Sequence, residues 1–239
     1  MGPAAALPQS VFTDNVCITA AADESYGLFD YTVSKEYGYA MLTGYRGKAE
    51  NVTIPDKLGG YSVQVIDKNA FYKNENIVTV KIPSTVTMIK YSAFAYCKNL
   101  KKIENMNNCS NLCFIEGCAF YECQKLEGID LSNAEIIDGC AFEGCSSLTS
   151  ISAPKATNFG PAVFRDCINL QSAALSENVK ELPNKMFQGC ENLVFSIPRS
   201  VKSIGDYCFE NCDNFSYIVV PAGCTHIGEY ALGVQYYKR

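Results

Sequence analysis

Ser92-Ala93-Phe94-Ala95-Tyr96-Cys97-Lys98-Asn99-Leu100 is the stretch that decides the fold, because its central Phe-x-x-Cys motif recurs along the chain. The motif occurs six times, at Phe94/Cys97, Phe120/Cys123, Phe142/Cys145, Phe164/Cys167, Phe187/Cys190 and Phe209/Cys212, so the Phe returns every 22 to 26 residues. A period in this range is typical of a solenoid, in which each unit buries its apolar face only by stacking on copies of itself. The repeat therefore predicts one elongated body whose function resides on an extended surface rather than in a pocket.

Each unit continues from this motif as Leu-x-x-Ile-x-Ile-Pro and then Val-x-x-Ile-Gly. The last two apolar residues of the first segment alternate with other residues, which predicts a half-buried strand that the proline ends. A second short strand is expected at Val86-Ile89 and its equivalents. Because Ala93, Phe94, Cys97 and Leu100 are spaced by three and four residues, a short helical turn is expected to complete the coil. The predicted fold class is an α+β solenoid of about seven to eight coils.

The two ends of the chain differ from this repeat. Residues 1–22 are small and apolar and end on Thr19-Ala20-Ala21-Ala22, which resembles the remnant of a secretory signal peptide; a flexible leader is the alternative. Residues 23–51 are expected to form an N-terminal capping β-hairpin, and residues 52–239 the repeats. Leu232 stands where the next Phe is due and no capping unit follows, so the array is expected to be truncated at its C-terminus.

Composition argues against a nucleic-acid partner and against a membrane span in this segment. The net charge is −5, and the Lys and Arg residues are spread along the repeats, so the basic patch that neutralises phosphates in a nucleic-acid complex is missing. Apolar stretches are interrupted well before about 18 residues, so no membrane span is expected.

The full motif, Ala-Phe-x-x-Cys-x-x-Leu-x-x-Ile-x-Ile-Pro-x-x-Val-x-x-Ile-Gly, resembles the BspA-like leucine-rich repeat, and residues 52–239 consist of it. The resemblance implies a leucine-rich-repeat array that is secreted or displayed on a cell surface, adhesive, and able to bind host, matrix or cell-surface proteins. Three departures put the local register in doubt: Asn74 occupies the first Cys position, the unit after Cys97 is about three residues long, and Leu193-Phe195-Ile197 is one residue short.

The chain is cysteine-rich, with an odd number, 13, of cysteines. Because equivalent Cβ atoms on neighbouring coils lie about 4.8 Å apart, beyond the ~3.8 Å of a disulfide, mostly reduced and buried thiols are expected. The more specific alternative is a zinc site formed by Cys109, Cys113, Cys118 and Cys123. The spacings between these residues, however, do not match the paired Cys-x2-Cys motif of zinc sites. No metal and no cofactor are predicted.

The sequence also gives little reason to expect an enzyme. His226 is the single histidine, so a catalytic Ser-His or Cys-His pair would have to include it, and it lies between two apolar positions where it should face solvent. No phosphate-binding glycine loop is present. No catalytic residue is therefore predicted.

The strand face is the predicted ligand-binding surface, because stacked coils align the outward residues of each main strand in two columns. The hypothetical binding residues are Thr79, Lys81, Lys102, Glu104, Asp130, Ser150, Ser152, Ser172 and Tyr217, and the columns also contain Gly128, Ala174, Val194, Ser196 and Val219. A second candidate is the group of tyrosines around the cap, namely Tyr26, Tyr31, Tyr37, Tyr39 and Tyr45.

The leading hypothesis is a secreted or surface-displayed module that binds a protein ligand through this face. Glycan binding is the first alternative, favoured if Tyr and Asp or Asn side chains converge on one exposed patch. A structural spacer that presents neighbouring domains is the second, favoured by the small, Ser-rich middle of the face.

Overall fold

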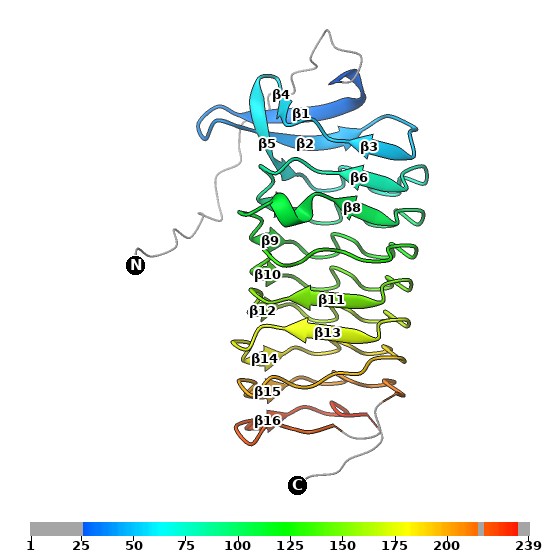
Figure 1. The fold of residues 1–239 in the computed structure, drawn as a ribbon, viewed down its shortest axis with the longest axis vertical. Helices are drawn as coiled ribbons and strands as arrows, with labels where there is room; N and C mark the ends of the chain where they lie inside the picture. The colour runs from blue at the N-terminus through cyan, green and yellow to red at the C-terminus, as the bar shows by residue number, and fades with distance from the viewer. Residues whose placement is uncertain (1–25, 215–217, 234–239) are drawn as a thin grey trace.

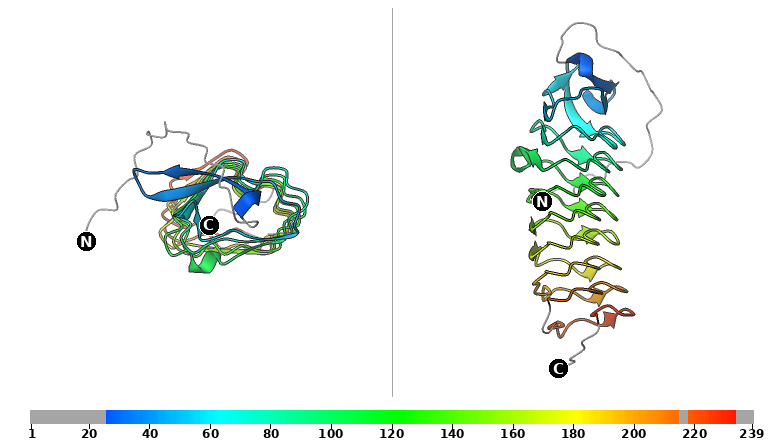
Figure 2. Two further views of the ribbon diagram at one scale, coloured as in Figure 1. Left: turned by 90° about the horizontal axis from the view of Figure 1, so that it is seen from above. Right: turned by 90° about the vertical axis from the view of Figure 1, so that its right-hand side faces the viewer.

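The computed structural model describes residues 26–214 and 218–233, which form a solenoid built from stacked coils (Figure 1). The expected leader, residues 1–22, and the chain beyond Gly233 lie outside the described residues. Eight coils are centred on buried residues of the repeat, Phe71, Phe94, Phe120, Phe142, Phe164, Phe187, Phe209 and Leu232. Viewed along its long axis, the array shows one coil superimposed on the next around a shared interior (Figure 2).

The first coil is preceded by η1 (Tyr26–Leu28), β1 (Phe29–Ser34) and β2 (Tyr39–Tyr45). β1 and β2 pair antiparallel, and β2 then pairs in parallel with β5 (Tyr61–Ile66), which also contacts β4 (Lys57–Leu58). This arrangement joins the hairpin directly to the edge of the first coil.

Each coil contributes strands to two sides of the body. On one side lie β3 (Asn51–Thr53), β6 (Thr79–Lys81) and β8 (Lys102–Glu104), followed by β11 (Ser150–Ala153) and β13 (Ser172–Leu175). The other side carries β7 (Met88–Ile89), β9 (Phe114–Ile115), β10 (Ile136–Ile137), β12 (Asn158–Phe159), β14 (Glu181–Leu182), β15 (Ser203–Ile204) and β16 (His226–Ile227). Neighbouring coils pair in parallel on both sides, for example β6 with β8 and β7 with β9.

The predicted helical turn is wrong, and the fold is a β-solenoid rather than an α+β solenoid. The helical elements among the described residues are two three-residue 3-10 helices, η1 and η2 (Met106–Asn108). Around each Phe the chain instead makes two tight turns: Ser92 and Tyr96, which flank Phe94 by two residues, have φ of 53° and 62°. Alternate N–H groups leave the coil, as when Phe94 N donates to Ala119 O at 2.8 Å, so they cannot close a helix.

A continuous column of phenylalanine rings forms the core. From Phe71 to Phe209, successive ring centroids lie 4.9, 5.1, 5.2, 5.6, 5.6 and 5.7 Å apart, and the planes are within 13° of parallel. Tyr45 extends the column beyond Phe71 at 5.5 Å, and Phe29 follows at 5.1 Å. The coils therefore share one apolar interior, which extends into the hairpin.

The column of rings continues through the two units whose length departs from the repeat, the long unit after Cys97 and the short unit around Phe195. The extra residues after Cys97 form η2, which projects from the outline of the coils (Figure 2). In the short unit, Phe195 packs beside the stacked pair Phe187 and Phe209, with ring centroids 5.1 and 5.8 Å from theirs. Within the described ranges 26–214 and 218–233, no helix is long and apolar enough to cross a membrane.

Candidate functional site

The strand face places the predicted residues in aligned columns, in two blocks. In the first block Thr79 pairs with Lys102, and Lys81 with Glu104. The bridge from Lys102 to Gly128 extends this block by one coil. In the second block Ser150 pairs with Ser172 and Ser152 with Ala174, and Ser172 continues to Val194. Tyr217 lies outside the described residues.

The side chains of these columns face solvent, as the alternation in the sequence predicts. Lys81, Lys102, Asp130, Ser150, Ser152 and Ser172 are exposed, whereas Thr79 and Glu104 are partly covered. Toward the C-terminal end of the face the column positions become apolar: Val194 is 63% exposed and Val219 is 69% exposed. The face thus changes from charged, through small and polar, to apolar along the array.

Several of the polar groups in the first block already have partners. Lys102 Nζ lies 3.2 Å from Glu104 Oε1, and Thr79 donates a hydrogen bond to Asn51. Asp130 accepts a hydrogen bond of 2.9 Å from the Ser132 N–H. These contacts hold the charged side chains along the face, and Lys81 remains exposed beside them.

A hollow of about 460 Å³ interrupts this face between two coils. Its lining comes from Lys101–Asn107 on one coil and Glu127–Asp130 on the next. Gly128 opens the hollow because it has no side chain, and a Cβ added there would meet no atom within 4 Å. The long unit supplies one wall through Asn105 and Met106, where η2 begins. Sequence reasoning missed this hollow, although the extra residues after Cys97 were its signal.

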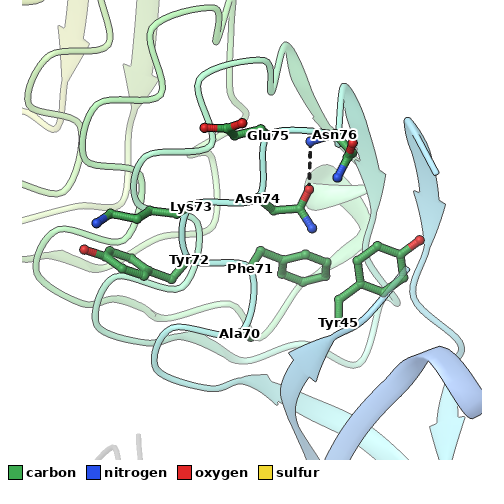
Figure 3. A pocket seen from close by; sticks show the side chains of 8 residues that line it. All are labelled: Tyr45, Ala70, Phe71, Tyr72, Lys73, Asn74, Glu75 and Asn76. Carbon is green, nitrogen blue, oxygen red and sulfur yellow. Dashed lines mark hydrogen bonds between the residues drawn. The ribbon is translucent and has the colours of Figure 1, made fainter. Parts of the chain in front are cut away.

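A second hollow, of about 340 Å³, lies at the junction between the hairpin and the first coil (Figure 3). Its lining is Tyr45, Ala70, Phe71, Tyr72, Lys73, Asn74, Glu75 and Asn76. Asn74 stands where later coils have Cys, and its Oδ1 accepts hydrogen bonds from the N–H groups of Asn76 and Ile77 at 3.0 and 3.2 Å. Figure 3 shows the side chains of this segment on two sides: Phe71, Asn74 and Asn76 lie on the side of Tyr45, whereas Tyr72, Lys73 and Glu75 point the other way.

A row of tyrosines continues from this second hollow across three coils. Tyr72 and Tyr96 meet edge to face with ring centroids 5.8 Å apart, and Tyr96 and Tyr121 do so at 5.2 Å. Lys73 Nζ lies 5.1 Å from the Tyr72 ring centroid and 5.6 Å from that of Tyr96. The tyrosines predicted around the cap do not form one exposed surface, because Tyr31 is buried in the core while Tyr37 is exposed.

The repeated cysteines form an internal ladder. Each thiol donates to the carbonyl oxygen of the Phe one coil earlier, from Cys97 to Phe71 at 3.0 Å through to Cys212 to Phe187 at 3.0 Å. Burial raises the pKa of Cys97 and of Cys212 to about 12.

Three of the four cysteines considered as zinc ligands lie against separate carbonyl oxygens. Cys109 Sγ lies 3.3 Å from Pro83 O, Cys113 Sγ 3.6 Å from Thr87 O, and Cys123 Sγ 3.1 Å from Phe94 O. No metal-binding group of His, Cys, Asp and Glu occurs in the part of the chain that the structure describes. His226 is exposed in β16, where its backbone pairs with Ser203.

Comparison with known proteins identifies the repeat. The family model described as the BspA type leucine rich repeat region matches six copies, over residues 45–134, 64–194 and 113–235. The leucine rich repeat protein of T. pallidum is 30% identical, with a TM-score of 0.72 over 79% of this chain and 88% of that one.

Two further solved structures share the fold. A leucine rich cell surface protein from Faecalibacterium prausnitzii is 21% identical, with a TM-score of 0.66 over 89% of this chain and 73% of that one. A leucine-rich repeat protein from Bacteroides ovatus is 25% identical, with a TM-score of 0.65 over 90% of this chain and 56% of that one. Among curated proteins, none matches the chain. Since the family model covers most of the residues, the chain belongs to the BspA-type leucine-rich repeat family.

Proposed function

We propose that this protein is a non-catalytic interaction module, secreted or displayed on a cell surface, that binds a protein ligand through its strand face. The observation that carries the proposal is the Gly128 hollow, because it opens on the same face as the exposed columns. A hollow in an otherwise even surface can receive a projecting side chain of a partner, which is where binding energy concentrates in protein interfaces.

The chemistry of the face suits a protein better than a small ligand. Polar groups surround the hollow while Ile129, which packs against the core, supplies an apolar part of its lining. Farther along, Val194 and Val219 expose apolar surface that a partner could cover. An extended face of this kind can bury the roughly 800 Å² per partner that a stable complex needs. The F. prausnitzii protein of the same fold is described as a cell surface protein, which agrees with the proposed location.

Filling the hollow tests the proposal. Gly128→Trp places an indole in open space, so the coil should fold unchanged while the partner loses its site. Immobilised extracellular-matrix proteins, such as fibronectin and laminin, would be titrated with wild type and variant by surface plasmon resonance. We expect G128W to raise the dissociation constant of a bound matrix protein at least about 30-fold, a loss of about 2 kcal/mol.

Thr157→Trp is the matched control, since Thr157 is exposed beside β12 on the other side of the coil. This variant should bind like the wild type. If G128W bound the same matrix protein with unchanged affinity, the hollow would not be the site. Combined substitution of Lys81, Lys102 and Asp130 would then show whether the rest of the face contributes.

Glycan binding is the second candidate, and the hollow at Asn74 favours it. The Tyr45 ring and the Asn76 amide lie on the same side of this segment and offer an aromatic group beside a hydrogen-bonding group (Figure 3). Wild type that bound sugars on a glycan array, with loss of the signal in Asn76→Ala but not in G128W, would support this alternative. Binding to neither proteins nor glycans would favour a structural spacer.

A further inference from the structure

Most of the charged side chains that line the Gly128 hollow are held in ion pairs. Lys101 Nζ lies 3.5 Å from Glu127 Oε1, across the two coils. Lys102 Nζ lies 3.2 Å from Glu104 Oε1, within one strand. These two pairs include both lysines of the lining and two of its three carboxylates. The positive charge of the hollow is therefore already balanced by negative charge.

Asp130 is the third carboxylate, and it has no cation beside it. Its side chain is exposed and accepts the Ser132 N–H at 2.9 Å, a bond within its own turn. Among residues 26–214 and 218–233, no Lys, Arg or His nitrogen lies within 4.0 Å of the Asp130 carboxylate. Two lysines against three carboxylates leave the lining with a net charge of −1.

The register of the strands brings a second carboxylate close to Asp130. Lys102 forms a parallel bridge with Gly128, and two further residues along the same register place Glu104 beside Asp130. Neighbouring strands lie about 4.8 Å apart. Two like charges at adjacent positions of neighbouring strands repel each other. A cation that reached both carboxylates would relieve this repulsion.

The remaining lining suits a side chain with an apolar stem. Ile103, Met106 and Ile129 contribute to the walls of the hollow, and Gly128 leaves its opening free. An arginine combines an apolar stem with a planar group of several N–H donors, which can bond two carboxylates at once. A lysine offers a compact and strongly hydrated point charge instead. Shape and charge together favour arginine.

We propose that the Gly128 hollow receives an arginine side chain of the protein ligand, whose guanidinium binds Asp130 and Glu104. The stem of this arginine lies against Ile129. This inference rests on the proposed function, because it names the chemistry of the side chain that the hollow receives. The partner is therefore a protein that presents an arginine on a projecting segment of its surface.

A short peptide tests the proposal without the natural ligand. Acetyl-Gly-Arg-Gly-amide would be titrated into the isotope-labelled full chain, and the amide signals of Gly128 and Asp130 would be followed by NMR. We expect saturable shifts of both signals, with a dissociation constant of roughly 1 mM. The peptide with citrulline, which has the shape of arginine without its charge, should bind at least about 5-fold more weakly. The peptide with lysine should also bind more weakly than the arginine peptide.

Variants of the protein place the peptide in the hollow. Asp130→Asn should weaken the arginine peptide at least about 5-fold. Its turn should persist, because the Asn side-chain oxygen can still accept the Ser132 N–H. Asp56→Asn is the matched control, since it removes an exposed carboxylate outside the lining, and it should bind like the wild type. Gly128→Trp should abolish the shifts, because the indole would fill the opening.

Absence of shifts, equal binding of the citrulline or lysine peptide, or unchanged affinity in Asp130→Asn would overturn the arginine assignment. A loss of matrix-protein binding in G128W would still support the strand face as the binding surface in that case. Conversely, arginine-specific shifts without binding of any tested matrix protein would support the arginine site and count against the proposed ligands. The two proposals can therefore fail independently.

Discussion

At the scale of single residues, the repeated cysteine serves both as an apolar filler and as a hydrogen-bond donor. Phe120 O accepts the N–H of Cys123 in its own coil at 3.1 Å and the thiol of Cys145 from the next coil at 3.2 Å. A valine of similar size could not make the second bond, and burying a serine hydroxyl would cost more than burying a thiol. This double requirement explains why the position returns as Cys in six units.

The buried thiols predict a dependence of stability on alkaline pH. Burial raises the pKa of Cys97 from 9.0 to about 12, so the unfolded chain loses this proton at a lower pH than the folded one. The contribution to stability is full below pH 9 and is lost between pH 9 and 12, with a slope of up to about 1.4 kcal/mol per pH unit for each thiol. Urea unfolding of wild type and Cys97→Ala at pH 7 to 11 would measure how the free energy of unfolding depends on pH in each.

The difference between the two proteins isolates the thiol from lysine and tyrosine titrations that both share. We expect wild type to exceed Cys97→Ala by about 1–2 kcal/mol at pH 7. That advantage should shrink above pH 9. A difference that stays constant up to pH 11 would contradict the raised pKa.

At the scale of the element, each coil depends on two left-handed residues that flank its Phe. The residue two positions after the Phe is Lys73, Tyr96, Glu122, Gly144, Asp166, Gly189 or Asn211, and all seven have positive φ. Five of them are not glycine and bear a steric cost that the intercoil hydrogen bonds must offset. The glycines also make room: a Cβ on Gly144 would lie 2.8 Å from Glu122 Oε1.

Gly144→Ala is expected to lower the free energy of unfolding by about 1–2 kcal/mol, because the methyl group is strained at φ 74° and displaces Glu122. Gly128→Ala is the matched control, since its Cβ meets no neighbour within 4 Å and its φ is not in the left-handed region. Chemical denaturation of both variants provides the comparison. Equal losses in the two would argue against a special role of the left-handed turn.

At the scale of the whole molecule, the phenylalanine column makes neighbouring coils depend on one another. Phe142 stacks on Phe120 at 5.2 Å and on Phe164 at 5.6 Å, and is fully buried. In a solenoid each unit contacts only its neighbours, so stability is the sum of local terms and interfaces. A defect in the middle of the column weakens two interfaces at once.

Phe142→Ala should therefore lower the free energy of unfolding by about 3–5 kcal/mol and divide the array into two segments that open separately. Hydrogen exchange would show faster exchange in the coils on either side of residue 142. Phe114→Ala, in the half-buried position of β9, should have a smaller and local effect. Uniform loss of protection along the entire array would contradict the nearest-neighbour picture.

Much of the architecture could be read from residue order alone, because like residues in successive coils must lie above one another to bury a common interior. The period of Phe94 and its equivalents predicted the column, and the alternation around Ile103 and Ile151 predicted which side chains face solvent. Family membership followed from the same recurrence.

The tertiary structure was needed where one spacing fits two conformations. Ala93, Phe94 and Cys97 at intervals of three and four residues suit a helix as well as two consecutive turns, and the N–H bonds to the next coil decide for the turns. The Gly128 hollow likewise arises between coils. Spacing within one coil carries no information about it, because the hollow depends on how two coils are placed against each other.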